Sequence, residues 1–193
     1  MADRVAIFID GAYLEYMLKD EFKSVPIDFQ AFSKAMAGSA DILRTYYYHC
    51  PPYQSSPPTE EERQRYAARR KFYTAIDRLP RFTVRLGRLA LRGVGTDGTP
   101  SFEQKRVDIL LGVDMTQLAV KGQIQQAELL AGDSDFIPAV TVAKNEGILV
   151  RLFRGGGCHS DLWQEVDERV RIDQTFIDSV TKMSQTRLPL PSD

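Results

Sequence analysis

Short apolar segments, each about the length of one β-strand, alternate with helical patterns along most of the chain. The apolar segments cover residues 4–9, 41–48, 81–92, 128–131 and 148–153, the third with a bulge or kink at Gly87, and GVGTDGTPS after it is expected to be a flexible turn. The helical patterns cover residues 12–22, 28–36, 59–79, 108–120 and 136–145, with one or two short helices from Leu162. Such alternation is satisfied by a parallel sheet with helices packed against it. We therefore expect an α/β fold whose central, mostly parallel sheet has about five strands and helices on both faces.

Length and composition limit the classes of protein that the chain can belong to. With 193 residues, 43% of them hydrophobic, it can bury one substantial core. We expect a single domain over residues 1–180 and a disordered tail over residues 181–193. No apolar run reaches the roughly 18 residues of a membrane span, and the N-terminus lacks the pattern of a signal peptide. Two lone cysteines, Cys50 and Cys158, fit a reducing compartment. These features predict a cytoplasmic protein without a membrane partner.

Positive charge is concentrated in one part of the chain. Residues 63–92, called here the basic block, hold ten of the 25 Lys and Arg residues but only one of the 26 acids. Asymmetry of this kind indicates a polyanionic partner, although an ordinary solvated helix face gives the same pattern.

Four aspartates are predicted to meet at one edge of the sheet. Asp10 ends the first strand, Asp133 and Asp135 follow the strand LLAG, and Asp108 begins a helix. Ligands of parallel α/β sheets bind beyond the carboxyl ends of the strands. Several carboxylates held together need compensating positive charge, and oxygen ligands suit Mg²⁺ or Mn²⁺. Each aspartate also has a structural interpretation, because Asp108 would favour a helix N-terminus and Asp133 could cap a helix.

Three blocks of the sequence resemble the signature of a known family. FIDGAYL (8–14), KRVDILLGVDM (105–115) and LLAGDSDFIPAV (129–140) are similar, in order and spacing, to the motifs of NYN domains, and SDLWQEVD (160–167) resembles the family's closing segment. The LabA-like branch of the PIN-like nuclease superfamily is the subgroup that this sequence resembles most. The resemblance covers about residues 3–178. It implies a three-layer PIN-like, Rossmann-like fold and a metal-dependent ribonuclease that acts on single-stranded or structured RNA.

The resemblance also implies roles for individual residues. Asp10, Asp108, Asp133 and Asp135 would be the catalytic residues and would hold one or two Mg²⁺ or Mn²⁺ ions, with a metal-bound water attacking the phosphodiester. Beside them, Ser134 could orient a water or a phosphate, and Lys105 could neutralise phosphate charge. Asp114 would point about 240° around the helix from Asp108, which predicts a supporting role.

Position 13 departs from the family pattern. The family usually has DGAN where this chain has Asp10-Gly11-Ala12-Tyr13. Tyr13 could stack on a base, or it could be a packed aromatic residue at the start of a helix.

Several basic residues are candidates for contacts with nucleic acid. Arg63, Arg69, Arg70 and Lys71 lie in the basic block, interleaved with aromatic residues, and Arg154 precedes three glycines that could bind a phosphate. On a helix some of these aromatic residues must face the core, which leaves mainly the arginines for phosphate contacts.

The sequence also allows other interpretations of the function and of the metal. An RNA-binding or regulatory module of the same fold, with weak or no cleavage, is the leading alternative, and Tyr13 favours it. A phosphatase of the haloacid dehalogenase type would need a second aspartate after FID, which FIDGA lacks. A zinc site made by His49, Cys50, Cys158 and His159 is disfavoured, because the strands that they follow would lie roughly 14 Å apart. Exposed apolar residues of strand 82–91 or of the tail could serve a homodimer.

Overall fold

The computed structural model describes residues 3–94 and 100–181, and its centre is a parallel sheet of six strands. The strands of this sheet are β1 (Arg4–Asp10), β2 (Asp41–His49), β3 (Phe82–Leu86), β6 (Gln126–Leu130), β7 (Leu149–Arg154) and β8 (Glu168–Arg171). Their order is β3-β2-β1-β6-β7-β8, and each neighbouring pair is parallel. The predicted α/β class is confirmed. The sheet has one strand more than expected, since β8 lies in a segment for which only helices were predicted.

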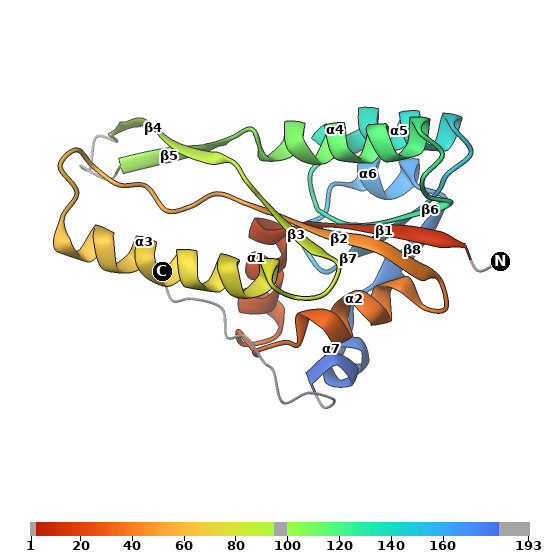
Figure 1. Ribbon diagram of the computed structural model, residues 1–193, viewed down its shortest axis with the longest axis horizontal. Helices are drawn as coiled ribbons and strands as arrows, with labels where there is room; N and C mark the ends of the chain where they lie inside the picture. Colours follow the sequence, from red (N-terminus) through yellow and green to blue (C-terminus); the bar gives the residue numbers. More distant parts are fainter. Residues whose placement is uncertain (1–2, 95–99, 182–193) are drawn as a thin grey trace.

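Helices cover both faces of the sheet and make the fold three-layered (Figure 1). The helices are α1 (Gly11–Glu21), α2 (Phe29–Ala37), α3 (Glu60–Asp77), α4 (Val107–Val120), α5 (Ile137–Asn145), α6 (Ser160–Glu165) and α7 (Gln174–Thr181). One hydrophobic cluster joins the sheet to α4, α5 and α6, and a second joins it to α1, α2, α3 and α7. The predicted tail, residues 181–193, lies outside the described residues except for Thr181 at the end of α7.

Residues 5–9 of strand β1 are all apolar, and their burial explains why. Ala6 and Phe8 belong to the cluster under α4 and α5, whereas Val5, Ile7 and Ile9 belong to the cluster on the opposite face. All five side chains are fully buried. A central parallel strand buries both of its faces, so each position carries an apolar residue until the chain reaches Asp10.

The prediction of one bent strand over residues 81–92 was wrong. The chain leaves the sheet at Gly87, and β4 (Arg88–Val94) then pairs with β5 (Pro100–Lys105) as a separate antiparallel hairpin. A Cβ atom at Gly87 would lie 2.6 Å from the carbonyl oxygen of Lys105 and 2.7 Å from Val107, so the close approach requires glycine. Residues 95–99, part of the expected turn, lie outside the described residues.

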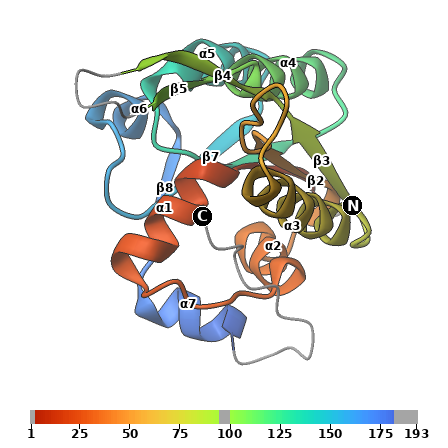
Figure 2. The same cartoon turned by 90° about the vertical axis from the view of Figure 1, so that its left-hand side faces the viewer.

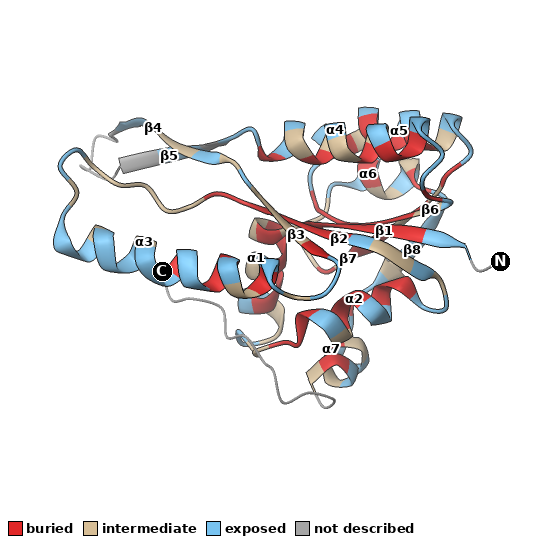
Figure 3. Cartoon of the chain, in the orientation of Figure 1, coloured by how far each residue is buried: buried red, intermediate tan, exposed pale blue. Residues whose placement is uncertain are grey.

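The hairpin and the first turns of α3 extend beyond the carboxyl edge of the sheet, one on each side (Figures 1 and 2). Helix α3 begins with the predicted capping box, in which Thr59 and Glu62 bond each other's backbone N–H groups. The part of α3 that extends past the sheet is largely exposed, while the sheet beside it is buried (Figure 3). The β4–β5 hairpin and the first turns of α3 thus flank the edge of the sheet where the aspartates were predicted to lie.

A buried carboxyl group in β6 makes stability depend on pH. Glu128 is fully buried, and its Oε1 lies 2.9 Å from Nη1 of Arg151 on β7. Burial raises the pKa of Glu128 from 4.5 to about 7, although the charge of Arg151 acts against this. Between these two values the folded state binds more protons than the unfolded state, so the free energy of unfolding falls as pH rises from 4.5 to 7.

The substitution Glu128→Gln is expected to abolish this fall in the free energy of unfolding with rising pH. Between pH 4.5 and 7.5 the wild type should lose about 1–2 kcal/mol that the variant keeps, measured by urea unfolding at both pH values. Glu61→Gln, which changes an exposed acid on α3, is the matched control and should keep the wild-type slope. A Glu128→Gln variant with the wild-type slope would show that Glu128 does not titrate in this range.

Candidate active site

Asp10 links the end of β1 to the start of α1. Its carboxylate accepts hydrogen bonds from the backbone N–H groups of Ala12 (3.0 Å) and Tyr13 (3.2 Å), so it caps the helix. Burial raises the pKa of Asp10 to about 6; the Tyr13 N–H and the charge of His49 act against this, and the charge of Asp108 adds to it. The carboxylate therefore lies half-buried at the carboxyl edge of the sheet, near a second acid.

Asp133 and Asp135 follow the neighbouring strand β6. Asp133 accepts the N–H of Asp135 (3.0 Å) and so caps the short 3-10 helix Ser134–Phe136. Asp108 lies in the first turn of α4, and its pKa is raised by burial and then by the charges of Asp133 and Asp135. Asp108, Asp133 and Asp135 are exposed to solvent. The four predicted aspartates thus lie near one another, and each interacts with at least one of the others.

The donor chemistry of this cluster fits a hard divalent cation. Carboxylate oxygens are the ligands that Mg²⁺ prefers, and mutual repulsion of the kind acting on Asp108 is relieved by a bound cation. Over residues 3–94 and 100–181, however, no three acid, His or Cys side chains already gather around one point as metal ligands. Asp10, Asp108, Asp133 and Asp135 would hold the ion.

His159 lies beside Asp133 and Ser134, although the sequence analysis gave it no role there. Its backbone N–H donates to the carbonyl oxygen of Gly132 (2.9 Å), which brings the loop after β7 over the aspartates. Its Nδ1 is 3.0 Å from Oγ of Ser134 and 4.0 Å from Oδ1 of Asp133. A hydrogen bond with His159 can therefore orient the hydroxyl group of Ser134.

Tyr13 packs inside the fold. Its side chain is 8% exposed, and its hydroxyl group donates to the carbonyl oxygen of Gly156 (2.9 Å) and accepts the N–H of Gly155 (3.1 Å). The ring lies so close to Gly132 that a Cβ atom there would be 2.5 Å from Cε2 of Tyr13. Burial raises the pKa of this phenol, which therefore stays protonated. Tyr13 thus joins α1, the turn before Asp133 and the glycine loop after β7.

Tyr13→Phe should destabilise the fold by about 1–2 kcal/mol, because the buried N–H of Gly155 would lose its acceptor. Urea unfolding measures the loss, and hydrogen exchange should be faster at the amide of Gly155. Tyr16→Phe, an exposed tyrosine on the same helix, is the control and should change neither. Unchanged stability and exchange in Tyr13→Phe would mean that these hydrogen bonds do not hold the loop.

Arg69 is buried rather than available on the surface of α3. It is 6% exposed, and its Nη1 lies 2.6 Å from Oε1 of Glu15 on α1. His49, at the end of β2, also faces Glu15, with 3.2 Å between Nε2 and Oε1. Nδ1 of His49 accepts the N–H of Cys50 (2.8 Å), so Nε2 is the ring nitrogen that faces Glu15. Despite burial, these partners lower the pKa of Glu15.

The other basic residues predicted to bind nucleic acid differ in their surroundings. Arg70 and Lys71 are exposed on α3, whereas the aromatic side chains of Phe72 and Tyr73 are buried, as expected. Arg63 pairs with Glu60 at the start of α3 (3.0 Å). The guanidinium group of Arg154 lies 4.0 Å above the ring centre of Trp163.

Asp114 and Lys105 lie on opposite sides of Asp108 along the chain. Asp114 accepts a hydrogen bond from the Tyr48 hydroxyl (3.0 Å) and pairs with Arg85 (3.0 Å), so it ties α4 to β2 and β3. Lys105 ends β5 with an exposed side chain, 3.8 Å from Glu103. Asp114 therefore supports the fold around the site, and Lys105 lies at the end of the hairpin, three residues before Asp108.

Together the three layers and the aspartates at the carboxyl edge define a PIN-like α/β domain. Residues 4–173 match the family model of the NYN domain, so the chain belongs to the NYN domain family, whose members are generally nucleases. A crystal structure of a protein of unknown function, VPA0982 from Vibrio parahaemolyticus RIMD 2210633, has a similar fold, with a TM-score of 0.61 and 18% sequence identity over 91% of this chain and 96% of that chain. No curated protein matched. In the described part of the chain, no helix has the length and apolar character needed to cross a membrane.

Proposed function

We propose that the protein is a metal-dependent ribonuclease of the LabA-like branch that hydrolyses RNA phosphodiester bonds. The observation that carries this proposal is the set of acids that follow β1 and β6 and begin α4, where burial and then the charges of Asp133 and Asp135 raise the pKa of Asp108. Acids that repel one another in this way favour a bound Mg²⁺ or Mn²⁺ ion.

Some of these residues would bind the metal ion, and others would bind the substrate. Asp10, Asp108, Asp133 and Asp135 hold the ion, which when bound supplies an activated water and neutralises charge on the phosphate. Ser134, hydrogen-bonded to His159, orients a water or a phosphate oxygen. Lys105 adds positive charge at the rim, and Asp114 and Tyr13 fix the elements that carry the acids.

The substrate would approach along the exposed basic residues of α3. Four members of the basic block pair with acids and are partly neutralised: Arg63, Arg69, Arg81 and Arg85. Arg70 and Lys71 remain exposed for phosphate contacts, and Arg63 or Arg154 could join them by exchanging partners. Two free cysteines favour a cytoplasmic location. A homodimer through the exposed Leu86 of β3 remains a prediction.

An RNA-binding module with weak or no cleavage is the second candidate. Tyr13 favours this function, because it occupies the position where the family usually has Asn. Its hydroxyl group is hydrogen-bonded to the glycine loop, so no side-chain amide is present at this position to support cleavage. The two candidate functions differ in whether bound RNA is cleaved.

Cleavage of a labelled single-stranded RNA separates these candidates. A nuclease should produce shorter fragments with Mn²⁺ or Mg²⁺ and none with EDTA. Retention of intact RNA under both conditions would support the binding module, and neither binding nor cleavage would overturn both.

The salt dependence of RNA binding tests whether α3 contacts the phosphates. Replacing Arg70 and Lys71 by Glu should weaken RNA binding at least tenfold at about 50 mM salt and flatten the slope of log K against log salt by about one or two. Arg4→Glu with Lys34→Glu, which reverses two exposed charges away from the carboxyl edge, is the matched control. An unchanged slope in the α3 variant would show that phosphates do not pass there.

A further inference from the structure

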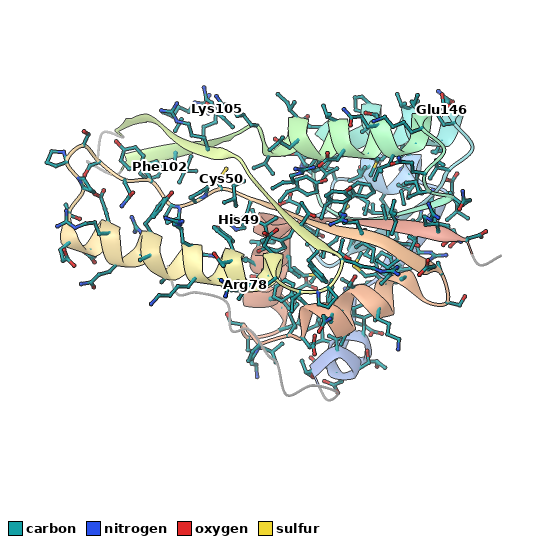
Figure 4. The ribbon with its side chains drawn as sticks, viewed as in Figure 1. His49, Cys50, Arg78, Phe102, Lys105 and Glu146 are labelled. Carbon is teal, nitrogen blue, oxygen red and sulfur yellow. The ribbon has the colours of Figure 1, made fainter. Side chains whose placement is uncertain are left out.

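A pocket opens beyond the carboxyl edge, between α3 and the β4–β5 hairpin. It has a volume of about 240 Å³ and is lined by segments from three parts of the chain, among them Tyr53, Arg65, Leu89 and Phe102. His49 and Cys50 also line it and form its inner end, towards the sheet. Figure 4 shows Phe102 on the hairpin side, with Cys50 and His49 farther towards the sheet. This volume is below the roughly 300–1,000 Å³ of pockets for drug-sized ligands, which favours a ligand of about one base.

One wall of the pocket is aromatic. The rings of Tyr53 and Phe102 lie 5.1 Å apart with a tilt of 39°, and Phe102 is 39% exposed. Because these two rings already touch, a flat ligand would stack on their open faces rather than between them. Stacking of this kind is how proteins hold unpaired bases without regard to sequence.

The rim of the pocket is basic, and the surface continues into a second hollow. Arg65 is exposed on α3 beside the aromatic wall. An adjoining pocket of about 290 Å³ shares Tyr53 and Leu89 and adds Tyr66 and Arg88. The two adjoining pockets thus combine aromatic side chains (Tyr53, Tyr66, Phe102) with arginines (Arg65, Arg88), the combination that suits stacked bases and their phosphates.

The inner end of the pocket borders the aspartates. A Cβ atom on Gly11, the residue after Asp10, would lie 2.7 Å from Cδ2 of His49. A Cβ atom on Gly87 would lie 3.1 Å from Sγ of Cys50 and 2.7 Å from Val107, the residue before Asp108. A nucleotide in the pocket would thus have its neighbouring phosphate at the acid cluster.

We propose that this pocket binds an unpaired nucleobase of the RNA substrate next to the cleaved phosphate, by stacking on Phe102 and Tyr53, with Arg65 contacting the adjoining phosphate. The proposal rests on the proposed function for its substrate, and it makes the substrate single-stranded at this position. A paired base could not enter, because its faces are covered by its neighbours in the duplex.

Binding measured in EDTA tests the pocket without any cleavage. The probe is a fluorescein-labelled 12-nucleotide uridine homopolymer, compared with an RNA duplex of the same length and followed by anisotropy. Phe102→Ala should weaken single-strand binding about 5- to 100-fold and change duplex binding less than twofold, while Phe102→Trp should retain wild-type affinity. Arg65→Ala should lower the salt slope by about one. Val120→Ala and Arg4→Ala, which alter exposed residues away from this edge, are the matched controls.

A base analogue reports stacking directly. The fluorescence of 2-aminopurine in a single strand should be quenched further by the wild type and by Phe102→Trp, but not by Phe102→Ala. Wild-type affinity and quenching in Phe102→Ala, or equal losses for single strand and duplex, would overturn the proposal even if the protein cleaves RNA. Conversely, if the variants show the expected binding and quenching but the protein does not cleave RNA, the pocket is confirmed as a base-binding site and only the nuclease activity is refuted.

Discussion

Asp10→Asn should lower metal-dependent RNA cleavage at least about 100-fold while leaving the metal-free protein folded and somewhat more stable. A metal ligand is worth several kcal/mol in the transition state, and each 1.4 kcal/mol is tenfold in rate. Asn caps a helix about as well as Asp, so the start of α1 is kept. The substitution also removes a half-buried charge near Asp108, which should raise the free energy of unfolding at pH 8 by about 1–2 kcal/mol.

Thermal unfolding with and without Mn²⁺ checks this prediction in the same samples. The wild type should gain about 2–3 kcal/mol of stability at a hundredfold excess of the ion over its dissociation constant, and Asp10→Asn should gain much less. Asp20→Asn, an exposed acid on the same helix, should behave like the wild type in both assays. An Asp10→Asn protein that gains as much from Mn²⁺ as the wild type would remove Asp10 from the metal site.

Glu15→Ala should destabilise the protein by about 3–4 kcal/mol at pH 7. It would leave the guanidinium group of Arg69, whose side chain is 8% exposed, without the carboxylate that lies 2.6 Å from it. Breaking one side of a buried ion pair is costly because the remaining charge stays desolvated. At 2–4 °C per kcal/mol for a chain of this size, the melting temperature should fall by about 6–16 °C.

The pH dependence of this loss has a definite sign. The pKa of Glu15 in the folded protein is lowered from 4.5, so the stability that it contributes is fully present above 4.5 and disappears as pH falls through the lowered value. The difference between wild type and Glu15→Gln should therefore shrink in acid. Asp41→Asn breaks the exposed pair with Arg81 and should cost less than about 1 kcal/mol. A Glu15→Ala variant as mild as Asp41→Asn would contradict the structural importance of the pair.

Features that depend on local sequence could be predicted well. Strand β1 is an unbroken apolar run because both of its faces are buried, and the capping box of α3 uses residues three positions apart. Asp10, Asp133 and Asp135 could be predicted to lie at one edge because strand ends in a parallel sheet share that edge, which needs only the order of the elements. Their role as metal ligands stays a prediction.

Features that depend on contacts between distant segments could not be predicted. Arg69 belongs to a run of bases in the sequence, and nothing local indicates that Glu15, 54 positions earlier, lies beside it. The separation of β3 from β4 results from the crowding of Gly87 by Lys105 and Val107, which come after the hairpin. The strand-end rule could have pointed to His49 and His159, since each follows a strand, but they were considered only as zinc ligands.

The central claim, that these aspartates cut RNA, is tested most directly by single-turnover cleavage of one labelled RNA with Mn²⁺. Wild type, Asp133→Asn and Asp20→Asn are purified identically and compared at equal concentration. The account predicts fragments from wild type and Asp20→Asn, and at least about 100-fold slower cleavage by Asp133→Asn. Equal cleavage by all three proteins, or none by the wild type while it binds the RNA, would contradict it.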